Sequence, residues 1–583
     1  MCGIVGTNFK SNDFYSSIEV LRHRGPNNLG FLEYNNNQFG HTRLSIIDLD
    51  DEANQPMIFD DIIITFNGEI YNYQELINKE KLICKTKSDT EVLIRLYQKY
   101  EHDFLDKLNG MFSFCIYDKT KNKFFCARDR FGKKPFYYYY KDGKFIYASE
   151  IKSILKNLKT IPSLNQDGLD EYLSFLTPIN GNTFYQNIRK LDSGCFLTYS
   201  NNHLDIQTYY SLKSITTKYF NENDILLDIE RLLVSSVKER LVGDVEVATL
   251  LSGGIDSSLI SALYSKLSNK KISTFCIGYK DYPEYSELPF ARMVSKHINS
   301  NHYEILISQS DFIDNIETML EFTDEPFGDT ASIPTYLLSK QVHNSGIKVA
   351  LSGEGSDEIF LGYDSYFKML DYYKAKGKKE EFNLTKEWEY SNRALNNMHI
   401  YQTYGENFTE GQKEKLFKSY GMKNPLSRYY TEYDPIKWLS YIDLRIWVSD
   451  VLMTKIDRMS MANSLELRAP FLDYRLVEYL LGVDDKIKKG NTNKYLLKQI
   501  ASKYLPHEII HRKKKGFSSP YIEWLYEEYK DGILHTILRV NKELNIFNEN
   551  FVTFLYNEGK EKRFKQHVWN LYIFARWFEK VYL

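Results

Sequence analysis

The N-terminal third of the chain alternates short apolar runs with polar, turn-forming segments. Each run has the length of a single strand and is rich in Ile, Phe and Tyr, which favour strands. The predicted strands are residues 62–66, 111–117, 123–127, 136–140 and 145–148. Because short turns separate them, the pattern predicts a mostly antiparallel sheet system.

One helix is predicted within this region, beginning after Ser88. Ser88 is a residue type that caps helix N-termini, and Glu91 three positions later gives the pattern of a capping box. The apolar face of this helix is formed by Val92, Leu93, Leu96 and Tyr97.

From about residue 222 the strand-like runs alternate with helical patterns, which predicts a parallel α/β sheet. These runs are residues 245–251, 272–278, 302–307 and 347–351. The polar, turn-rich stretch 199–218 predicts a linker. We therefore expect a first domain over 1–210 and a second over 211–583.

Composition narrows the possible partners. The chain has 583 residues, 43% of them hydrophobic, and 75 basic against 77 acidic side chains, a net charge of −2. A chain of this length predicts several hydrophobic cores. Because it is nearly neutral, it has no long-range electrostatic field that would attract nucleic acid or an anionic membrane. The six cysteines show no zinc-site or disulfide spacing, and no apolar run is long enough to span a bilayer. These features predict a cytoplasmic protein.

Cys2 follows the initiator methionine directly. Removal of Met1 would leave an N-terminal cysteine with both a thiol and a free α-amino group. An α-amino group has a pKa of roughly 7.7–8.0, so at neutral pH part of it is unprotonated and accepts the thiol proton. Cys2 is therefore a candidate nucleophile with its own base, although a cysteine there is more often a chance residue on a frayed terminus.

A second candidate site follows the predicted strand 245–251, where residues 252–258 read SGGIDSS before a helical pattern. Glycines let backbone N–H groups approach an anion, serines add donors, and the helix N-terminus points at the same place. The loop lacks the lysine of the G-x-x-x-x-G-K-[ST] motif, so it does not match the loop that grips a transferred γ-phosphate.

The loop after strand 347–351 has the same placement, with residues 352–358 reading SGEGSDE. If the two strands are parallel neighbours, both loops lie at the carboxyl edge of the sheet, where open α/β folds bind ligands. Asp256 and Asp357 would then share Mg²⁺ on a pyrophosphate group.

Together with further motifs, these features make the chain resemble the glutamine-dependent asparagine synthetases along nearly its whole length. The N-terminal motifs, typical of class II glutamine amidotransferases, are MCGI (1–4), RHRGP (22–26), HTRLSI (41–46), FNGEIYN (66–72), SDTE (88–91) and ARDRFG (127–132). The C-terminal motifs are the two loops, KIDRMSM (455–461) and SLELRAPFLD (464–473), which resemble the ATP-pyrophosphatase synthetase domain.

The resemblance implies an α+β fold of stacked antiparallel sheets, the N-terminal-nucleophile hydrolase sandwich, over residues 1–210. It implies an α/β parallel-sheet ATP-pyrophosphatase domain with added helices over residues 211–583. A passage between the two, apolar enough to keep ammonia unprotonated, requires that they pack together.

The resemblance also implies roles in a glutamine site. Cys2 would be the nucleophile, Asn67 and Gly68 would stabilise the oxyanion, and Arg43 would hold the α-carboxylate, with Glu69 and Asp89 on the α-amino group. Each residue also has a plainer interpretation: Arg43 as a surface ion pair, Asn67-Gly68 as a hairpin turn, and Asp89 as a helix cap.

In the second domain the resemblance implies an ATP and Mg²⁺ site. Glu354 would act as a base toward ammonia, and Lys494 would stabilise charge at the acyl-adenylate, with an exposed helix lysine as the equal alternative. Asp256 and Asp357 would hold Mg²⁺. The ATP-binding residues implied are Leu251, Ser252, Gly253, Gly254, Asp256, Ser257, Ile277, Ser352, Gly353 and Glu354.

The reaction implied is hydrolysis of glutamine at Cys2, transfer of ammonia, and amidation of an adenylated carboxylate, with AMP and pyrophosphate as products. Aspartate is the expected acceptor. The segment 324–332, DEPFGDTAS, resembles a branch of the family with more varied acceptors, which leaves a sugar uronic acid as an alternative. A non-catalytic regulatory relative is a second alternative, and the sequence leaves a homodimer open.

Overall fold

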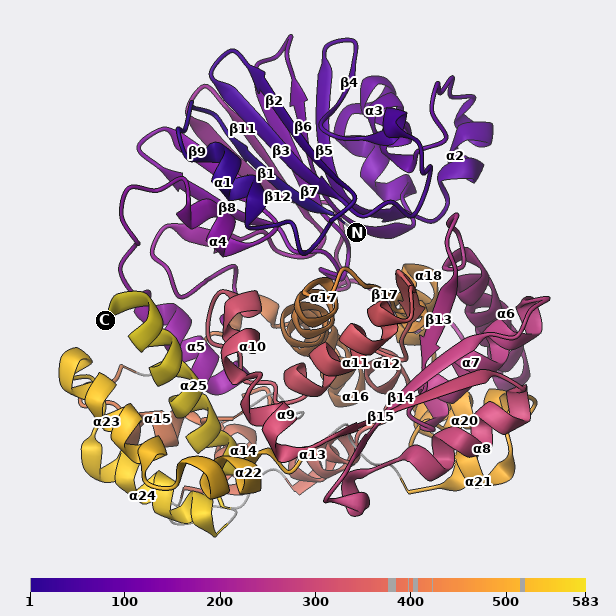
Figure 1. The fold of residues 1–583 in the computed structure, drawn as a ribbon. Coiled ribbons are helices and arrows are strands. Elements are labelled where there is room, and N and C mark those ends of the chain that lie inside the picture. Colours follow the sequence, from indigo (N-terminus) through magenta and orange to yellow (C-terminus); the bar gives the residue numbers. More distant parts are fainter. Residues whose placement is uncertain are drawn as a thin grey trace.

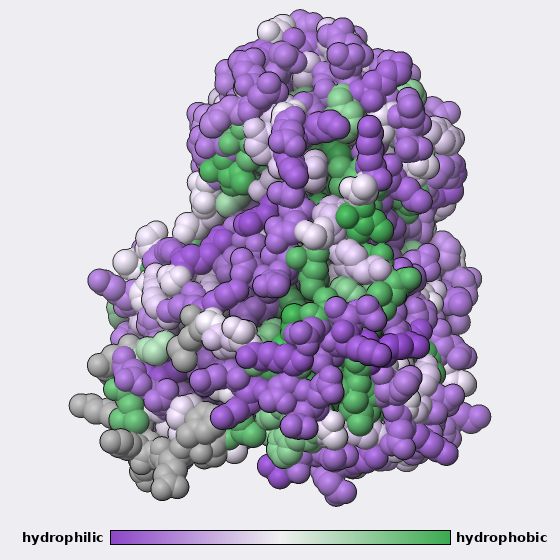
Figure 2. All heavy atoms as spheres, turned by 90° about the vertical axis from the view of Figure 1, so that its left-hand side faces the viewer, coloured by the Kyte–Doolittle hydropathy of each residue, from purple (hydrophilic) through white to green (hydrophobic). Residues whose placement is uncertain are grey.

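The computed structural model describes residues 2–375, 384–396, 398–401, 407–421, 423–513, 519–561 and 563–583. An upper lobe built of strands rests on a larger lower lobe that is mainly helical (Figure 1). Figure 2 shows a mostly hydrophilic surface on which apolar residues gather where the two lobes meet and below that narrowing. No helix in the described part of the chain combines the length and apolar character needed to span a bilayer.

The upper lobe holds two six-stranded antiparallel sheets, as predicted. The first has the order β10 (Ile188–Lys190), β8 (Tyr137–Lys141), β9 (Lys144–Ala148), β1 (Gly3–Thr7), β3 (Asn37–Arg43) and β2 (Asn28–Tyr34). The second has the order β12 (His203–Thr208), β11 (Cys195–Ser200), β7 (Lys123–Arg128), β6 (Gly110–Asp118), β5 (Ile62–Ile70) and β4 (Met57–Phe59).

The two sheets stack on a shared apolar core. Ile4 and Phe39 from the first sheet join Ile63 and Tyr117 from the second in one buried cluster. The Tyr147 hydroxyl also lies 2.8 Å from Thr65 Oγ1, linking the sheets through a buried hydrogen bond. The helices of the upper lobe are α1 (Phe14–Glu19), α2 (Tyr73–Glu80), α3 (Asp89–Tyr100) and α4 (Ile151–Leu155), whereas α5 (Gln166–Phe175) lies in the lower lobe (Figure 1).

Two local predictions are wrong in part. The stretch 199–218 is not a linker throughout, because residues 203–208 form β12 and pair with β11. Ser88 does cap α3, accepting from the Thr90 N–H, but the Glu91 carboxylate does not complete a capping box. It accepts instead from the N–H groups of Lys85 and Thr86, because the preceding loop folds back over the helix end.

The lower lobe contains a five-stranded parallel sheet, which confirms the α/β prediction. Its order is β15 (Asn301–Ile307), β14 (Ser273–Tyr279), β13 (Val247–Leu250), β16 (Val349–Leu351) and β17 (Glu466–Arg468). Helices near the sheet are α6 (Glu222–Glu239), α7 (Ile255–Leu267), α8 (Leu288–Ile298), α11 (Ser332–Asn344), α12 (Ser356–Phe360), α17 (Met453–Met461), α18 (Tyr474–Leu481) and α20 (Tyr495–Ala501). This arrangement places the loops after β13 and β16 side by side.

Further helices complete the lower lobe (Figure 1). They are α9 (Gln309–Ile313), α10 (Ile316–Thr323), α13 (Asp364–Ala375), α14 (Lys386–Leu395), α15 (Glu410–Leu416), α16 (Pro435–Asp443), α19 (Asp485–Lys489), α21 (His507–His511), α22 (Tyr521–Tyr529), α23 (Gly532–Leu544), α24 (Glu549–Lys560) and α25 (Lys565–Tyr582). Among them, α15, α23, α24 and α25 lie on the side away from the sheet (Figure 1). A π-helical segment, Leu444–Leu452, joins α16 to α17.

Candidate active sites

Cys2 lies directly before β1 in the interior of the upper lobe, with 8% of its surface exposed. Its backbone nitrogen, which would become the free α-amino group on removal of Met1, lies 3.1 Å from Asn67 Oδ1. Its carbonyl accepts from Arg24 Nε at 3.0 Å. Burial raises the pKa of the Cys2 thiol. The thiol therefore needs a nearby base to become a nucleophile at neutral pH. Met1 itself lies outside the described residues.

Asn67 and Gly68 lie inside β5, so the hairpin-turn interpretation is wrong. Asn67 is fully buried, and its Oδ1 is occupied by the Cys2 nitrogen. Its Nδ2 is buried and has no hydrogen-bond partner among the described residues. Gly68 has φ +156°, and a Cβ there would lie 2.1 Å from the Met111 carbonyl oxygen. A buried N–H donor beside a thiol is what a developing oxyanion requires.

Arg43 ends β3 and is 5% exposed, so it is not a surface ion pair. Its guanidinium donates to the carbonyl of Asp50 and to Asn54 Oδ1, both at 2.8 Å, and to the carbonyl of Asp48. No carboxylate of the described residues forms an ion pair with it. Neutral oxygens thus fix the orientation of Arg43 and leave its charge to attract an anion such as a carboxylate.

Asp89 and Glu69 are a pair of buried acidic residues in the same part of the upper lobe. Asp89 is the first residue of α3 rather than its cap, and its Oδ2 accepts from the Ile70 N–H at 2.9 Å. Burial, together with the charge of Glu466, raises the pKa of Asp89 to about 7. Burial and the charges of Glu466 and Asp89 also raise the pKa of Glu69. A bound cation would stabilise the ionised forms of both.

Two members of this cluster come from the lower lobe and were not assigned a role from the sequence. Glu466 and Arg468 of β17 pair with each other, and Arg468 Nη2 lies 3.9 Å from Glu69 Oε2. Both residues are fully buried. Both residues occur within the SLELRAPFLD motif, so the sequence did mark this segment as typical of the family. The motif could not show that β17 reaches the opposite lobe.

In the lower lobe, the loops after β13 and β16 meet as predicted, because these strands are parallel neighbours. Ser356 Oγ donates to Asp256 Oδ1 at 2.7 Å and so joins the first turns of α12 and α7, the helices that follow these loops. Gly253 has φ +75°, and a Cβ there would lie 2.6 Å from the Ala291 nitrogen, so only glycine fits. Gly254 precedes α7, whose N-terminus carries the partial positive charge that favours phosphate.

The other predicted nucleotide residues lie around the same edge. The Oγ atoms of Ser252 and Ser257 lie 3.0 Å apart and form a hydrogen bond. The Leu251 N–H donates to the Phe275 carbonyl at 2.8 Å. The remaining positions are buried Ile277 in β14, Ser352, whose N–H donates to the Arg468 carbonyl at 2.9 Å, and Gly353, which packs on the backbone of Ser257.

Lys494 lies between the two predicted metal ligands. Its Nζ is 2.6 Å from Asp256 Oδ2 and 2.6 Å from Asp357 Oδ1. Lys494 is 4% exposed, so the alternative of an exposed helix lysine is wrong. Burial lowers the pKa of Lys494, but the two carboxylates outweigh it and raise the pKa above the usual range.

The Asp256–Asp357 pair also fits Mg²⁺. Both carboxylates converge on one cation, and no group of three or more metal-ligating side chains occurs in the described part of the chain. Mg²⁺ is typically bound through one or two carboxylates together with phosphate oxygens and water. These two residues therefore suit a metal that arrives with a polyphosphate.

Glu354 faces a second buried lysine. Lys455 of α17 has its Nζ 3.3 Å from Asp329 Oδ2 and 3.7 Å from Glu354 Oε1. Burial raises the pKa of Glu354; Lys455 counteracts this, and the acidic neighbours add to it. Within the segment 324–332, Asp329 contacts the site through Lys455. Asp324 instead accepts from the Ile151 N–H at 2.7 Å and belongs to the contact with the upper lobe.

A buried ionic network joins the lobes between the two sites. Arg24, whose Nε holds the Cys2 carbonyl, also pairs with Glu150 at 2.8 Å and with Asp457 of α17 at 2.9 Å. Lys134 pairs with the same Asp457 at 3.1 Å. Because α17 also carries Lys455, one short helix contacts residues of both sites.

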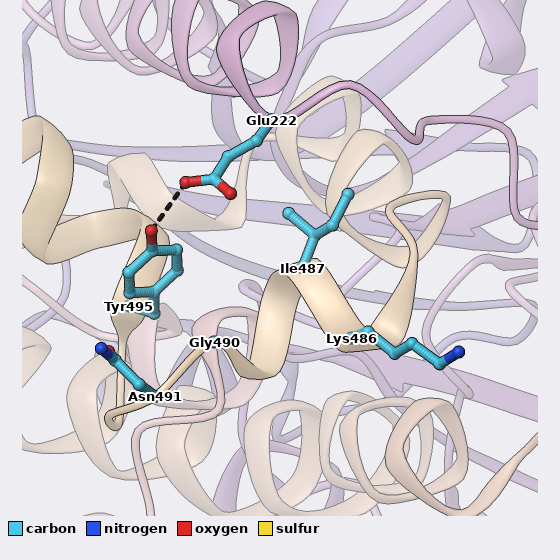
Figure 3. A pocket seen from close by; sticks show the side chains of 6 residues that line it. All are labelled: Glu222, Lys486, Ile487, Gly490, Asn491 and Tyr495. Carbon is cyan, nitrogen blue, oxygen red and sulfur yellow. Dashed lines mark hydrogen bonds between the residues drawn. The ribbon is translucent and has the colours of Figure 1, made fainter.

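A surface pocket of about 320 Å³ lies elsewhere, next to α20 (Figure 3). In it the Tyr495 hydroxyl donates to Glu222 Oε1 at 2.7 Å. Its lining residues are Glu222, Lys486, Ile487, Gly490, Asn491 and Tyr495, and none is a predicted site residue.

Comparison with known proteins is consistent with both halves of this arrangement. A glutamine amidotransferase domain model matches residues 1–210, and an asparagine synthase model matches residues 228–579. Asparagine synthetase [glutamine-hydrolyzing] 1 of Bacillus subtilis is 30% identical, covering 99% of this chain and 96% of its own length. Asparagine synthetase [glutamine-hydrolyzing] 3 of the same organism is 30% identical, covering 92% of each chain. The amidase chyE of Penicillium rubens is 28% identical, covering 94% of this chain and 90% of its own.

Proposed function

Because this chain belongs to the asparagine synthase family of glutamine-hydrolysing ligases, we propose that it converts aspartate to asparagine with glutamine as nitrogen donor and ATP as energy source. We also propose that the division of labour follows the chain, with glutamine hydrolysis in residues 1–210 and amide synthesis in residues 211–583.

In the first half-reaction, Cys2 attacks the side-chain amide of glutamine after its own α-amino group has accepted the thiol proton. Asn67 Nδ2 and the Gly68 backbone stabilise the oxyanion, the C–N bond breaks, and ammonia leaves with the proton that the α-amino group had accepted. Water then hydrolyses the glutamyl thioester, which releases glutamate and restores the Cys2 thiol. Arg43 holds the glutamine carboxylate, while Glu69 and Asp89 hold its ammonium. The unpartnered Nδ2 of buried Asn67 supports this assignment.

In the second half-reaction, the acceptor carboxylate attacks the α-phosphate of ATP, and ammonia then displaces AMP to form the amide. Asp256 and Asp357 would hold Mg²⁺, which would supply positive charge to the phosphates when bound. Lys494 stabilises negative charge on the reacting phosphate, and Glu354 accepts a proton from ammonia. The convergence of Asp256, Asp357 and Lys494 beside Glu354 is the observation that carries the proposal.

The test is aspartate-dependent release of pyrophosphate with ammonium as nitrogen donor, followed by mass detection of asparagine. We expect one AMP and one pyrophosphate for each asparagine. If millimolar aspartate gives no pyrophosphate while Cys2-dependent glutamine hydrolysis is normal, the aspartate assignment fails and uronic acids become the next acceptors to test. ADP and phosphate as stoichiometric products in phosphorus NMR would exclude the adenylate route.

A further inference from the structure

The charged side chains beside Glu354 form two groups that differ in what can balance them. In the first, Asp256 and Asp357 surround Lys494, and Mg²⁺ would arrive there together with the negative phosphates of ATP. In the second, Asp329 and Glu354 surround Lys455. Two ionised carboxylates and one ammonium leave this second group with one negative charge.

No other cation balances the second group among the described residues. Lys455 is the only lysine, arginine or histidine there that forms an ion pair with Asp329 or Glu354. Its side chain is 6% exposed, whereas those of Asp329 and Glu354 are 12% and 28% exposed. The carboxylates thus remain accessible to a small ligand while the lysine is covered. An uncompensated charge in a partly desolvated site is costly, so a cationic ligand group is favoured there.

Two contacts fix the position of the Asp329 carboxylate. Its Oδ1 accepts from the Ala331 N–H at 3.0 Å, just before α11, and its Oδ2 faces Lys455. Since both Asp329 and Glu354 approach the same Lys455 Nζ, their carboxylates converge on one small region. A group bound there lies beside Glu354 and therefore beside the reacting carboxylate.

We propose that Asp329 is a specificity-determining residue that binds, together with Glu354, the ammonium group of an amino-acid acceptor. This inference rests on the proposed amidation at the Glu354 site. An α-amino acid brings the missing positive charge, whereas a uronic acid brings a carboxylate and hydroxyl groups but no cation. The charge of this subsite thus selects against the sugar acceptor and in favour of the amino acid.

The test compares L-aspartate with succinate, which has the same two carboxylates but no ammonium group. Pyrophosphate release is measured with saturating ATP and ammonium, so that the Cys2 site does not contribute. For the unmodified enzyme we expect kcat/KM to favour aspartate by about 10- to 100-fold, the value of a charge-assisted contact. In Asp329→Asn the KM for aspartate should rise by a similar factor, and the reaction with succinate should be unchanged.

Matched variants separate this role from a structural one. Asp314→Asn changes an exposed aspartate at the end of α9 and should leave every constant unchanged. Asp329→Glu keeps the charge and should retain most of the preference for aspartate. Unchanged KM for ATP and unchanged glutamine hydrolysis in Asp329→Asn would show that both sites are intact.

Several outcomes would overturn the inference. Equal loss with aspartate and succinate would indicate a structural role. A rise in the KM for ammonium rather than aspartate would mean that the subsite binds the nitrogen donor. Normal aspartate kinetics in Asp329→Asn would overturn the inference but leave the proposed function standing. An unmodified enzyme that uses a uronic acid and no amino acid would overturn both.

Discussion

The glutamine site and the nucleotide site handle charge in opposite ways. In the upper lobe, Asn67 Nδ2 has no partner among the described residues, and Arg43 is held by neutral oxygens, so substrate must complete both. In the lower lobe, Lys494 already occupies the position between Asp256 and Asp357. The proposed glutamine site is therefore prepared for its ligand, whereas the proposed nucleotide site holds an internal cation that would share its carboxylates with a bound Mg²⁺.

The secondary-structure elements that carry the two sites also differ. Arg43, Asn67 and Gly68 belong to antiparallel strands inside a stacked core, where neighbouring strands fix each backbone position. Asp256 and Asp357 lie in the first turns of α7 and α12, just past the loops that follow β13 and β16, and their side chains are 22% and 20% exposed. Rigid strands suit the placement of an oxyanion donor, and helix first turns just past strand ends suit a ligand that binds at the edge of the sheet.

The largest expected effect separates the two sites completely. Cys2→Ala should abolish glutamine-dependent amide synthesis and leave ammonium-dependent synthesis largely intact, because only the upper site uses the thiol. Both rates are followed by pyrophosphate release. Intact-mass measurement of active enzyme provides the companion check, since a retained Met1 would rule out the α-amino group of Cys2 as the base.

The reciprocal change is Lys494→Met. Removing the buried cation from between two carboxylates should lower pyrophosphate formation by about 10²–10³, the usual loss for a group that stabilises transition-state charge. Glutamine hydrolysis should be retained. The control is Lys503→Met, which alters an exposed lysine just past the C-terminal end of α20, the helix that Lys494 precedes. A comparable loss in the control, or no loss in Lys494→Met, would contradict the assignment.

A third change tests whether the sites are physically joined. Asp457→Asn leaves Lys134 without its buried carboxylate and Arg24 with Glu150 alone, which should cost about 3–5 kcal/mol of unfolding free energy. Since Arg24 holds the Cys2 carbonyl, glutamine hydrolysis should also fall, by up to about 10²-fold for a displaced nucleophile. Thermal unfolding and glutaminase kinetics measure the two effects. Loss of stability with unchanged glutaminase would show that Asp457 does not position Cys2.

The smallest effect concerns pH. Asp89, with a pKa of about 7, is ionised above that pH and protonated below it. Only the ionised form attracts the glutamine ammonium, so the KM for glutamine should rise by up to about tenfold for each pH unit below 7. Asp89→Asn should have a high KM that changes less with pH in this range, because Glu69 is then the carboxyl left beside the ammonium. The KM for ATP in the ammonium-dependent reaction should not follow the same profile.

The pattern of apolar and polar residues along the chain was sufficient to predict the secondary structure near both sites. Short apolar runs placed β5, β6, β7, β8 and β9, and the change to alternating strands and helices placed β13 and β16 as strands of a parallel sheet. The phosphate loop was also visible, because a strand followed by Ser-Gly-Gly and a helix is a local feature. The linker prediction failed at β12, whose residues are mostly exposed and polar and so lack the apolar signal of a strand.

By itself, the sequence determined the two fold classes, the family and the residue types available for chemistry, since these depend on neighbours along the chain. Tertiary structure decided which charges meet. Lys494 reaches Asp256 across 238 positions, and Arg24 reaches Asp457 across 433. Only packing of the lobes brings Arg468 to Glu69 and selects Asp329 rather than Asp324 to face Glu354. A charged residue carries no periodic signal for its partner, because ion pairing depends on distance in space rather than on separation in sequence.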